Sequence, residues 1–293
     1  MSVREIDFSC KHNVLIQDED GVCLPMDVPY FESEYIAPGT WRIRTDGDAI
    51  YLVEGEREAI VIDSGYGAGN LRMYCQTLTQ KPVRCIVNTH DHFDHTANNA
   101  YFEKAYMTEA TRPLATIPFP SFAGIDFPRD YPVELVRDGD KIDLGGRTLE
   151  VLEIPDHAVG SIALLDSREG ILFSGDEITA SFKLINTSVE NVLGQMRKLQ
   201  SRKGEFDRIC PGPGGPCGPE VIDQYAETLE YLLRGGKGAP GMGFLPRRPQ
   251  PPSQGGPIVY DRFRARPCDM KIDQTPRRLN HADLFGVLVI YPA

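Results

Sequence analysis

The sequence predicts an α/β protein, because segments patterned like buried strands alternate with segments patterned like helices. Short apolar runs bounded by glycine or polar residues recur between positions 49 and 212, and two longer segments, 187–200 and 219–236, carry helix signals. Several of the predicted strands end in polar residues, which places candidate chemistry at one edge of the sheets. The 293 residues suffice for one large or two modest domains.

The predicted elements follow one another along the chain. Residues 49–65 contain two short strands around a turn at Gly55, and Gly65 closes the second strand. A helix is predicted within 70–80. Further strands are predicted within 83–90, 148–157, 161–166, 170–176, 206–212 and 285–293.

Two later helices have recognisable starts. Thr187 and Glu190 form a capping-box pattern that opens a helix through about Gln200. Pro219 starts the second helix, and the glycines at 235 and 236 end it. Apolar residues of this second helix fall on one face, which we expect to be buried: Val221, Ile222, Tyr225, Leu229, Leu232 and Leu233.

A Gly/Pro-rich stretch at 235–257 breaks regular structure and separates a body from a C-terminal segment. We therefore expect three parts: an N-terminal extension over 1–40, a body over 41–236, and a C-terminal extension over 237–293 that packs on the core.

Composition narrows the class of partner. The net charge of −11 resides mainly on the body, which argues against nucleic acid, because phosphate contacts need clustered Lys and Arg. The basic residues of 237–293 either lie against the acidic body or help to hold an anionic small-molecule substrate. A homo-oligomer contact through the extensions stays open.

The spacing of the cysteines and the lack of long apolar runs indicate the cellular compartment of the protein. The seven cysteines are scattered and form no CxxC pair, which argues against a zinc ribbon or a disulfide framework. No run approaches the roughly 18 apolar residues of a membrane helix, and the N-terminus lacks a signal-peptide core. We expect a cytoplasmic protein without a membrane partner.

The stretch Asn88–His95, NTHDHFDH, concentrates three of the six histidines and two aspartates after a predicted strand. Such a set can reach two divalent ions about 3.5–4 Å apart. Imidazole and carboxylate ligands without thiolate suit zinc, iron or manganese. The alternative, a chance cluster on a surface loop, fits the regular HxHxDH spacing poorly.

This spacing resembles the first motif of the metallo-β-lactamase superfamily, and the resemblance extends over 41–236. AIVIDSG, IPDHAVGSI and ILFSGDEI are similar to three further family segments. The resemblance implies a four-layered αββα sandwich with N- and C-terminal extensions. It also implies one or two divalent ions, zinc first and iron or manganese as alternatives. The implied ligands are His90, His92 and His157 for the first metal, Asp94 and His95 for the second, and Asp176 between the two.

One family ligand is missing. The family places a last histidine in PGHG, whereas this chain has CPGPGGPCG with Pro213 at that position. The second metal site is then more open, empty, or completed by His281 or Cys217. The chain also has Asp156 where the family motif has glycine. Asp63 is expected to fix the loop backbone rather than to bind metal.

Three functions are compatible with these motifs. The first is a metal-dependent hydrolase of the glyoxalase II/lactonase branch, in which a metal-bound hydroxide attacks an ester, thioester, lactone or lactam carbonyl. In that enzyme Asp94 is the catalytic residue that orients the water and takes its proton. The second is a mononuclear iron oxygenase resembling persulfide dioxygenases, with His90, His157 and Asp176 as ligands. The third is a non-catalytic, metal-stabilised ligand-binding or sensor protein.

Overall fold

The computed structural model describes residues 14–17, 20–25, 31–44, 48–65, 67, 69–115, 128–240, 248–250, 258–261, 266–267, 271–273 and 279–292. The chain divides into two compact units. The first contains residues 1–136, 143–147 and 247–273, and the second contains 137–142, 148–246 and 274–293.

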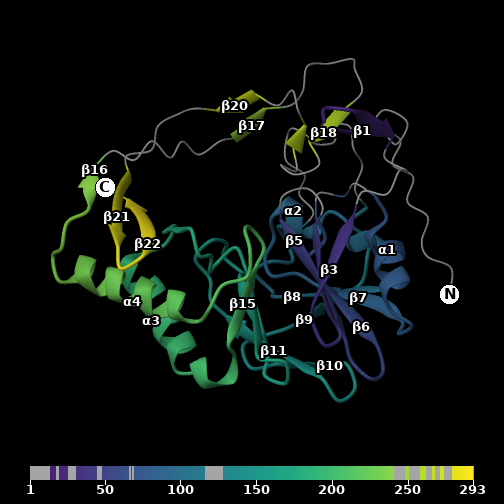
Figure 1. Ribbon diagram of the computed structural model, residues 1–293, viewed down its shortest axis with the longest axis horizontal. Helices are drawn as coiled ribbons and strands as arrows, with labels where there is room; N and C mark the ends of the chain where they lie inside the picture. Colours follow the sequence, from purple (N-terminus) through teal and green to yellow (C-terminus); the bar gives the residue numbers. More distant parts are fainter. Residues whose placement is uncertain are drawn as a thin grey trace. The chain divides into compact units, whose positions relative to one another are not determined.

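The first unit is built on a seven-stranded sheet of order β3-β4-β5-β6-β7-β8-β9 (Figure 1). Pairing is antiparallel from β3 to β6 and parallel from β6 to β9. The strands are β3 (Glu32–Ala37), β4 (Thr40–Arg44), β5 (Ala49–Glu54), β6 (Ala59–Ile62), β7 (Val83–Val87), β8 (Lys104–Met107) and β9 (Val133–Leu135).

The helix α1 (Leu71–Leu78) packs on this sheet, which confirms the helix predicted within 70–80. Asn70 caps it by accepting a hydrogen bond from the Met73 amide at 3.1 Å. Leu71 and Cys75 on its inner face join a core with side chains of β4 to β8. Two short helical turns, α2 (Phe93–Thr96) and η2 (Asn99–Tyr101), follow β7.

Four peripheral strands form a sheet of order β19-β18-β1-β2, and two more pair as β17-β20. Their bounds are β1 (Val14–Gln17), β2 (Cys23–Pro25), β17 (Arg248–Gln250), β18 (Ile258–Asp261), β19 (Arg266–Pro267) and β20 (Lys271–Asp273).

The predicted strand pair around Gly55 is confirmed as β5 and β6. The turn requires glycine, because a Cβ at this position would lie 2.3 Å from the carbonyl oxygen of Leu144. At the other end of the pair, β5 begins where β6 ends, since Tyr51 pairs with Ile62. The residue before β5 and the residue after β6 therefore meet at one edge of the sheet, where the parallel strand β7 also ends.

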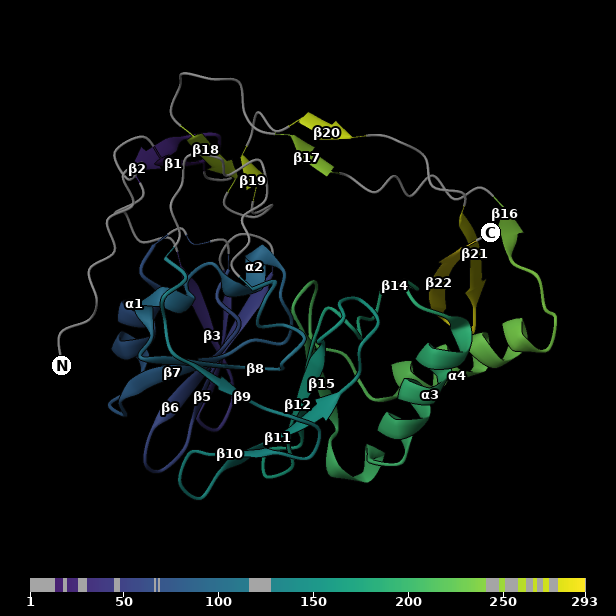
Figure 2. The same cartoon turned by 180° about the vertical axis from the view of Figure 1, so that it is seen from behind.

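The second unit contains a five-stranded sheet of order β10-β11-β12-β13-β15. Helices α3 (Val189–Gln200) and α4 (Glu220–Leu233) lie side by side and share a core with this sheet (Figure 2). The strands are β10 (Lys141–Asp143), β11 (Thr148–Glu153), β12 (Ile162–Asp166), β13 (Ile171–Gly175) and β15 (Arg208–Pro211), and a short turn η4 (Lys203–Glu205) precedes β15.

A second sheet in this unit has the order β14-β22-β21-β16. Its strands are β14 (Phe182–Leu184), β16 (Ala239–Pro240), β21 (Leu279–Leu284) and β22 (Val287–Pro292). The strand predicted within 285–293 is confirmed as β22, whose Val287 and Val289 join the core formed by α3 and α4. The three-part division at residues 40 and 236 stays a prediction.

Two details of the helix predictions are wrong. Ser188, not Thr187, caps α3 by accepting from the Asn191 amide at 3.1 Å. The Thr187 hydroxyl instead donates to Asp156 at 2.6 Å, so a tertiary contact takes the residue that the local pattern assigned to the cap. Leu233 is 41% exposed, because α4 ends at this residue and its last turn extends beyond the core.

Candidate metal centre

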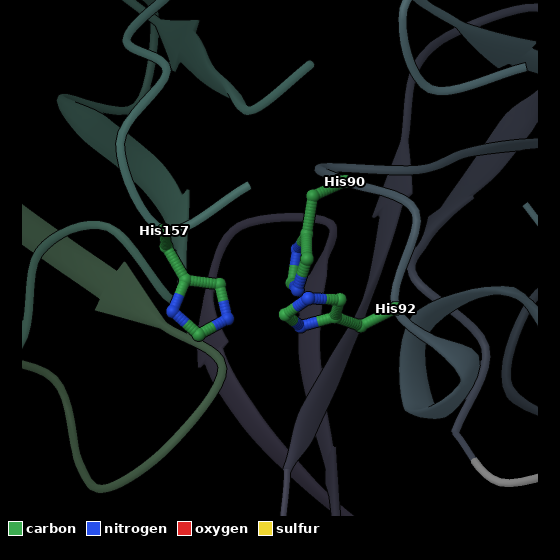
Figure 3. Close-up of side chains that lie close together, drawn as sticks. All are labelled: His90, His92 and His157. Atoms are coloured by element: carbon green, nitrogen blue, oxygen red, sulfur yellow. The ribbon is translucent and has the colours of Figure 1, made fainter. Parts of the chain in front are cut away.

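The HxHxDH segment forms the loop after β7 and the short helix α2. His90 and His95 are buried, and the Asp94 and His92 side chains are partly exposed. The His90 ring centroid lies 4.6 Å from that of His92 and 4.0 Å from that of His95. Figure 3 labels His90 and His92, which extend from this loop. The structure thus brings together all four predicted ligands of the first unit.

Asp63 holds His95 directly and His90 through Thr89. It follows β6 with a φ of 61°, and it is 3% exposed. Its Oδ1 accepts from the Thr89 amide and its Oδ2 from the Thr89 hydroxyl, both at 2.7 Å. The same Oδ2 lies 2.9 Å from His95 Nδ1. A carboxylate can only accept, so His95 Nδ1 carries the proton and its Nε2 keeps the lone pair.

His90 is fixed in the same tautomer. The single hydrogen of the Thr89 hydroxyl is donated to Asp63, so this oxygen can only accept from His90 Nδ1, which lies 3.0 Å away. His90 Nδ1 is therefore protonated and its Nε2 is the donor atom for a metal. This is the arrangement in which a carboxylate or hydroxyl behind a histidine sets a metal ligand.

Burial lowers the pKa of His92 below its ordinary value, and the neighbouring His95 lowers it further, against the opposing effect of Asp91. His92 is therefore neutral at pH 7, which is the form that binds metal.

A buried amide pair fixes the position of α2. Asn88 Nδ2 donates to the His95 carbonyl at 2.7 Å and to Asn99 Oδ1 at 3.0 Å. Asn99 Nδ2 donates back to Asn88 Oδ1 at 2.8 Å and to the Tyr131 hydroxyl at 3.0 Å. The sequence analysis missed this network, since single asparagines carry no signal of what they face in the fold.

Asp48, just before β5, is a site residue that sequence analysis also missed. One donor atom each of Asp48, Asp94 and His95 lie within 4.8 Å of one another. Burial and the nearby Asp94 carboxylate raise the pKa of Asp48 to about 8, against the lowering effect of His95. The register of β5 against β6 was the one signal that could have revealed it, because that register places the start of β5 at the edge where Asp63 lies.

In the second unit, His157 and Asp176 form a pair. β11 and β13 both run antiparallel to β12, so they end at the same edge of their sheet. His157 follows β11 and Asp176 follows β13, and His157 Nε2 lies 3.6 Å from Asp176 Oδ2. Figure 3 labels His157 on the loop that carries it. The two predicted ligands of this unit are therefore neighbours.

A buried ion-pair network lies beside His157. Lys183 Nζ contacts Asp156 Oδ2 at 2.9 Å and Glu177 Oε2 at 2.7 Å, and the three side chains are 0–3% exposed. Glu177 Oε1 accepts from the amides of Asp156 and His157 at 2.9 and 2.6 Å. Asp156 Oδ1 also accepts from the Thr187 amide at 2.9 Å. Asp156, which departs from the family motif, thus belongs to a hydrogen-bonded ion-pair network that fixes the His157 backbone.

The two suggested substitutes for the missing histidine gain no support. Among the residues that the structure describes, no candidate metal group includes His281 or Cys217. His281 lies in the middle of the β21–β22 pair, opposite Ile290. Cys217 pairs with Ile209 through the backbone, and burial together with Glu220 raises the pKa of its thiol, which disfavours a thiolate ligand.

The sequence model of the metallo-beta-lactamase superfamily matches residues 45–217, and the match covers the HxHxDH loop, Asp63, His157 and Asp176. Because this match spans more than half of the chain, the chain belongs to the metallo-beta-lactamase superfamily. The predicted family and fold class are confirmed.

Curated relatives narrow the class further. The chain is 32% identical over 221 residues to acyl-coenzyme A thioesterase MBLAC2 of Gallus gallus, which covers 64% of this chain and 79% of that protein. It is 27% identical over 168 residues to a hydroxyacylglutathione hydrolase of Hyphomonas neptunium, over 57% of this chain and 54% of that one. The chain is a hydrolase of the metallo-β-lactamase fold, as predicted.

Solved structures agree on the fold. A metallo-beta-lactamase from Pontibacter korlensis aligns with a TM-score of 0.54 at 19% identity, over 68% of this chain and 99% of that one. A subclass B3 metallo-beta-lactamase of Bradyrhizobium japonicum aligns with a TM-score of 0.53 at 20% identity, over 70% and 93%. Among the described residues, no helix is long and apolar enough to cross a membrane. Zinc and a cytoplasmic location stay predictions.

Proposed function

We propose that the chain is a metal-dependent thioesterase that acts on a small acylated thiol. In this proposal, His90, His92 and His157, the ligands that the family resemblance implies, would hold one divalent ion. Asp94 and His95 hold a second ion, and Asp176 is shared between the two. The donor set is imidazole and carboxylate throughout, which suits zinc and, as alternatives, iron or manganese.

The observation that carries the metal assignment is the fixed tautomer of two histidines. Thr89 and Asp63 accept hydrogen bonds from Nδ1 of His90 and His95, so these nitrogens carry the protons and both Nε2 atoms are lone-pair donors. Metal-ligating histidines regularly donate the other ring N–H to a supporting group in this way. Glu177 holds the His157 backbone through two amides, so the predicted ligand of the second unit is also held rigidly.

A divalent ion at these ligands would lower the pKa of a bound water to about 7. Asp94, in the first turn of α2, has a partly exposed carboxylate whose Oδ2 lies 3.8 Å from His95 Nε2. It would orient the attacking water and accept its proton. His92 remains neutral at the working pH, because burial lowers its pKa.

Thioester as the substrate class rests on the relatives. Acyl-coenzyme A and hydroxyacylglutathione, named for two groups of relatives, both carry their acyl group on a thiol. The oxygenase alternative needs only His90, His157 and Asp176 as ligands. In the oxygenase, Asp94 and His95 would bind no metal, and the Asp63–His95 contact would support no ligand. The observed contacts therefore favour the hydrolase.

The test is a substrate panel that follows thiol or acid release. The panel contains acyl-coenzyme A thioesters of several chain lengths, a hydroxyacylglutathione, a simple ester, a lactone and a β-lactam. We expect thioester cleavage that chelation abolishes and divalent metal restores. Asp94→Asn should lower kcat by about 10²–10⁴-fold, as loss of a proton acceptor does. Asp91→Asn, in the same loop, is the matched control and should keep activity.

Metal content and oxygen uptake separate the alternatives. Thioester cleavage should accompany divalent metal in the purified protein. Iron near one equivalent together with oxygen uptake on a persulfide would instead establish the oxygenase. A chelated, metal-free protein that still cleaves thioesters would refute the proposal.

A further inference from the structure

We propose that Asp48 is a ligand of the second metal ion and takes the place of the histidine that Pro213 removes. This inference rests on the proposed function, since it needs the same metal centre. It concerns only residues of the first unit, all of which approach one another at the edge where β5 starts and β6 and β7 end.

The geometry around His95 carries the inference. Its Nδ1 is bonded to Asp63, so Nε2 is the donor atom. Two carboxylate oxygens flank that nitrogen: Asp94 Oδ2 at 3.8 Å and Asp48 Oδ2 at 4.0 Å. Donor atoms bound tetrahedrally at about 2.1 Å lie about 3.4 Å apart. The observed separations are therefore those of groups that need to move only a few tenths of an ångström to bind one ion.

The carboxyl groups around His95 also support a metal ion at this position. Asp48, Asp63 and Asp94 place three carboxyl groups around one imidazole, and the Asp48 and Asp94 side chains are only 17% and 16% exposed. Carboxyl groups gathered with so little water cannot all ionise unless a cation lies among them. A divalent ion between Asp48, Asp94 and His95 supplies that charge.

The chemistry of Pro213 and the position of Asp48 explain why one residue can replace the other as a ligand source. Proline has no side-chain donor atom, so Pro213, two residues after the end of β15, cannot ligate. Asp48, just before β5, approaches His95 from within the first unit. The second site then retains three ligands within the first unit, Asp48, Asp94 and His95.

The test is calorimetric titration of chelator-stripped protein with zinc, a readout independent of turnover. We expect two equivalents for the wild type, and one tight equivalent for Asp48→Asn, with the second binding step weakened by at least about 100-fold, because loss of a direct ligand exceeds the roughly 10–100-fold cost of losing a supporting contact. Asp91→Asn, the matched control, should bind two.

Thermal unfolding with and without zinc gives a second, independent measure. Metal-free Asp48→Asn should melt at or above the wild-type temperature, because one of the crowded carboxyl groups is gone. With zinc present it should melt lower than the wild type. A purely structural Asp48 would instead lower the melting temperature in both states.

The outcomes are distinguishable. Two tight equivalents in Asp48→Asn would overturn the ligand role of Asp48. One equivalent in the wild type would also overturn it, while leaving the first metal site of the proposed function intact. No metal binding in the wild type would refute the proposed function itself.

Discussion

Replacing Lys183 by methionine tests how the second unit holds His157. Lys183 is the cation of a network in which Asp156 and Glu177 are both almost fully buried. Methionine has a similar length but no charge, so the variant leaves two buried carboxylates facing each other without a cation.

The expected cost is about 3–5 kcal/mol, the range measured when one partner of a buried ion pair is removed. Burial opposes the charge on Lys183, but Glu177 and Asp156 outweigh it and raise the pKa of Lys183 above its ordinary value. A raised lysine pKa stabilises the fold below its unfolded value of about 10.4 and ceases to do so only above the folded value. The full contribution of Lys183 is therefore present at pH 7.

Urea unfolding at pH 7, followed by circular dichroism, measures the loss in the free energy of unfolding. Thermal unfolding gives a second measure: at roughly 2–4 °C per kcal/mol, the melting temperature of the variant should fall by roughly 6–20 °C. Lys203→Met is the matched control. Lys203 pairs with Asp223 at the surface of the same unit, where side chains are 28% and 42% exposed, so its loss should cost about 0–1 kcal/mol.

The pH dependence gives a sharper criterion. Because the pKa of Lys183 is raised in the fold, the difference between Lys183→Met and the wild type should persist from neutral pH up to about pH 10 and shrink only as the pH rises through the folded pKa of Lys183. A loss below about 1 kcal/mol at pH 7 would refute the ion-pair account.

Three further predictions concern stability and thiol reactivity. Arg72→Met should cost about 2–4 kcal/mol in urea unfolding, because the buried guanidinium donates to two backbone carbonyls that would lose their partner; a change within 0.5 kcal/mol would contradict this. Tyr225→Phe should cost about 1 kcal/mol through the lost 2.8 Å hydrogen bond to the Thr179 carbonyl, and an unchanged urea midpoint would argue against it. Cys75, which is fully buried and whose thiol pKa burial raises, should resist iodoacetamide at pH 8 until the protein unfolds; rapid labelling of the native protein, seen by peptide mass spectrometry, would show that α1 opens locally.

Local pattern was sufficient to predict the strands and helices that carry the motifs. Apolar runs of strand length ending in polar residues predicted β6, β7, β11 and β13, and each of these ends next to a site residue. The HxHxDH spacing predicted ligand chemistry because histidines two residues apart after a strand have few other uses. In contrast, the cap of α3 was assigned one residue early, since Thr187 is drawn to Asp156 by a contact remote in sequence.

Supporting groups could not be predicted in the same way. Thr89, Asn88 and Asn99 are ordinary polar residues in the sequence, and their roles depend on which side chains the sheet edge brings within 3 Å. Asp48 follows no motif. Its proximity to His95 depends on the β5–β6 register, which the pairing of whole strands determines.

The sequence by itself determined the ligand types, their order along the chain, the absence of a donor at Pro213 and the alternation of strands and helices, because these depend on residue identity and short-range periodicity. Only the tertiary structure decided which nitrogen of His90 and His95 is available and that Asp48 stands beside Asp94, because both depend on hydrogen bonds and charges between residues distant in sequence.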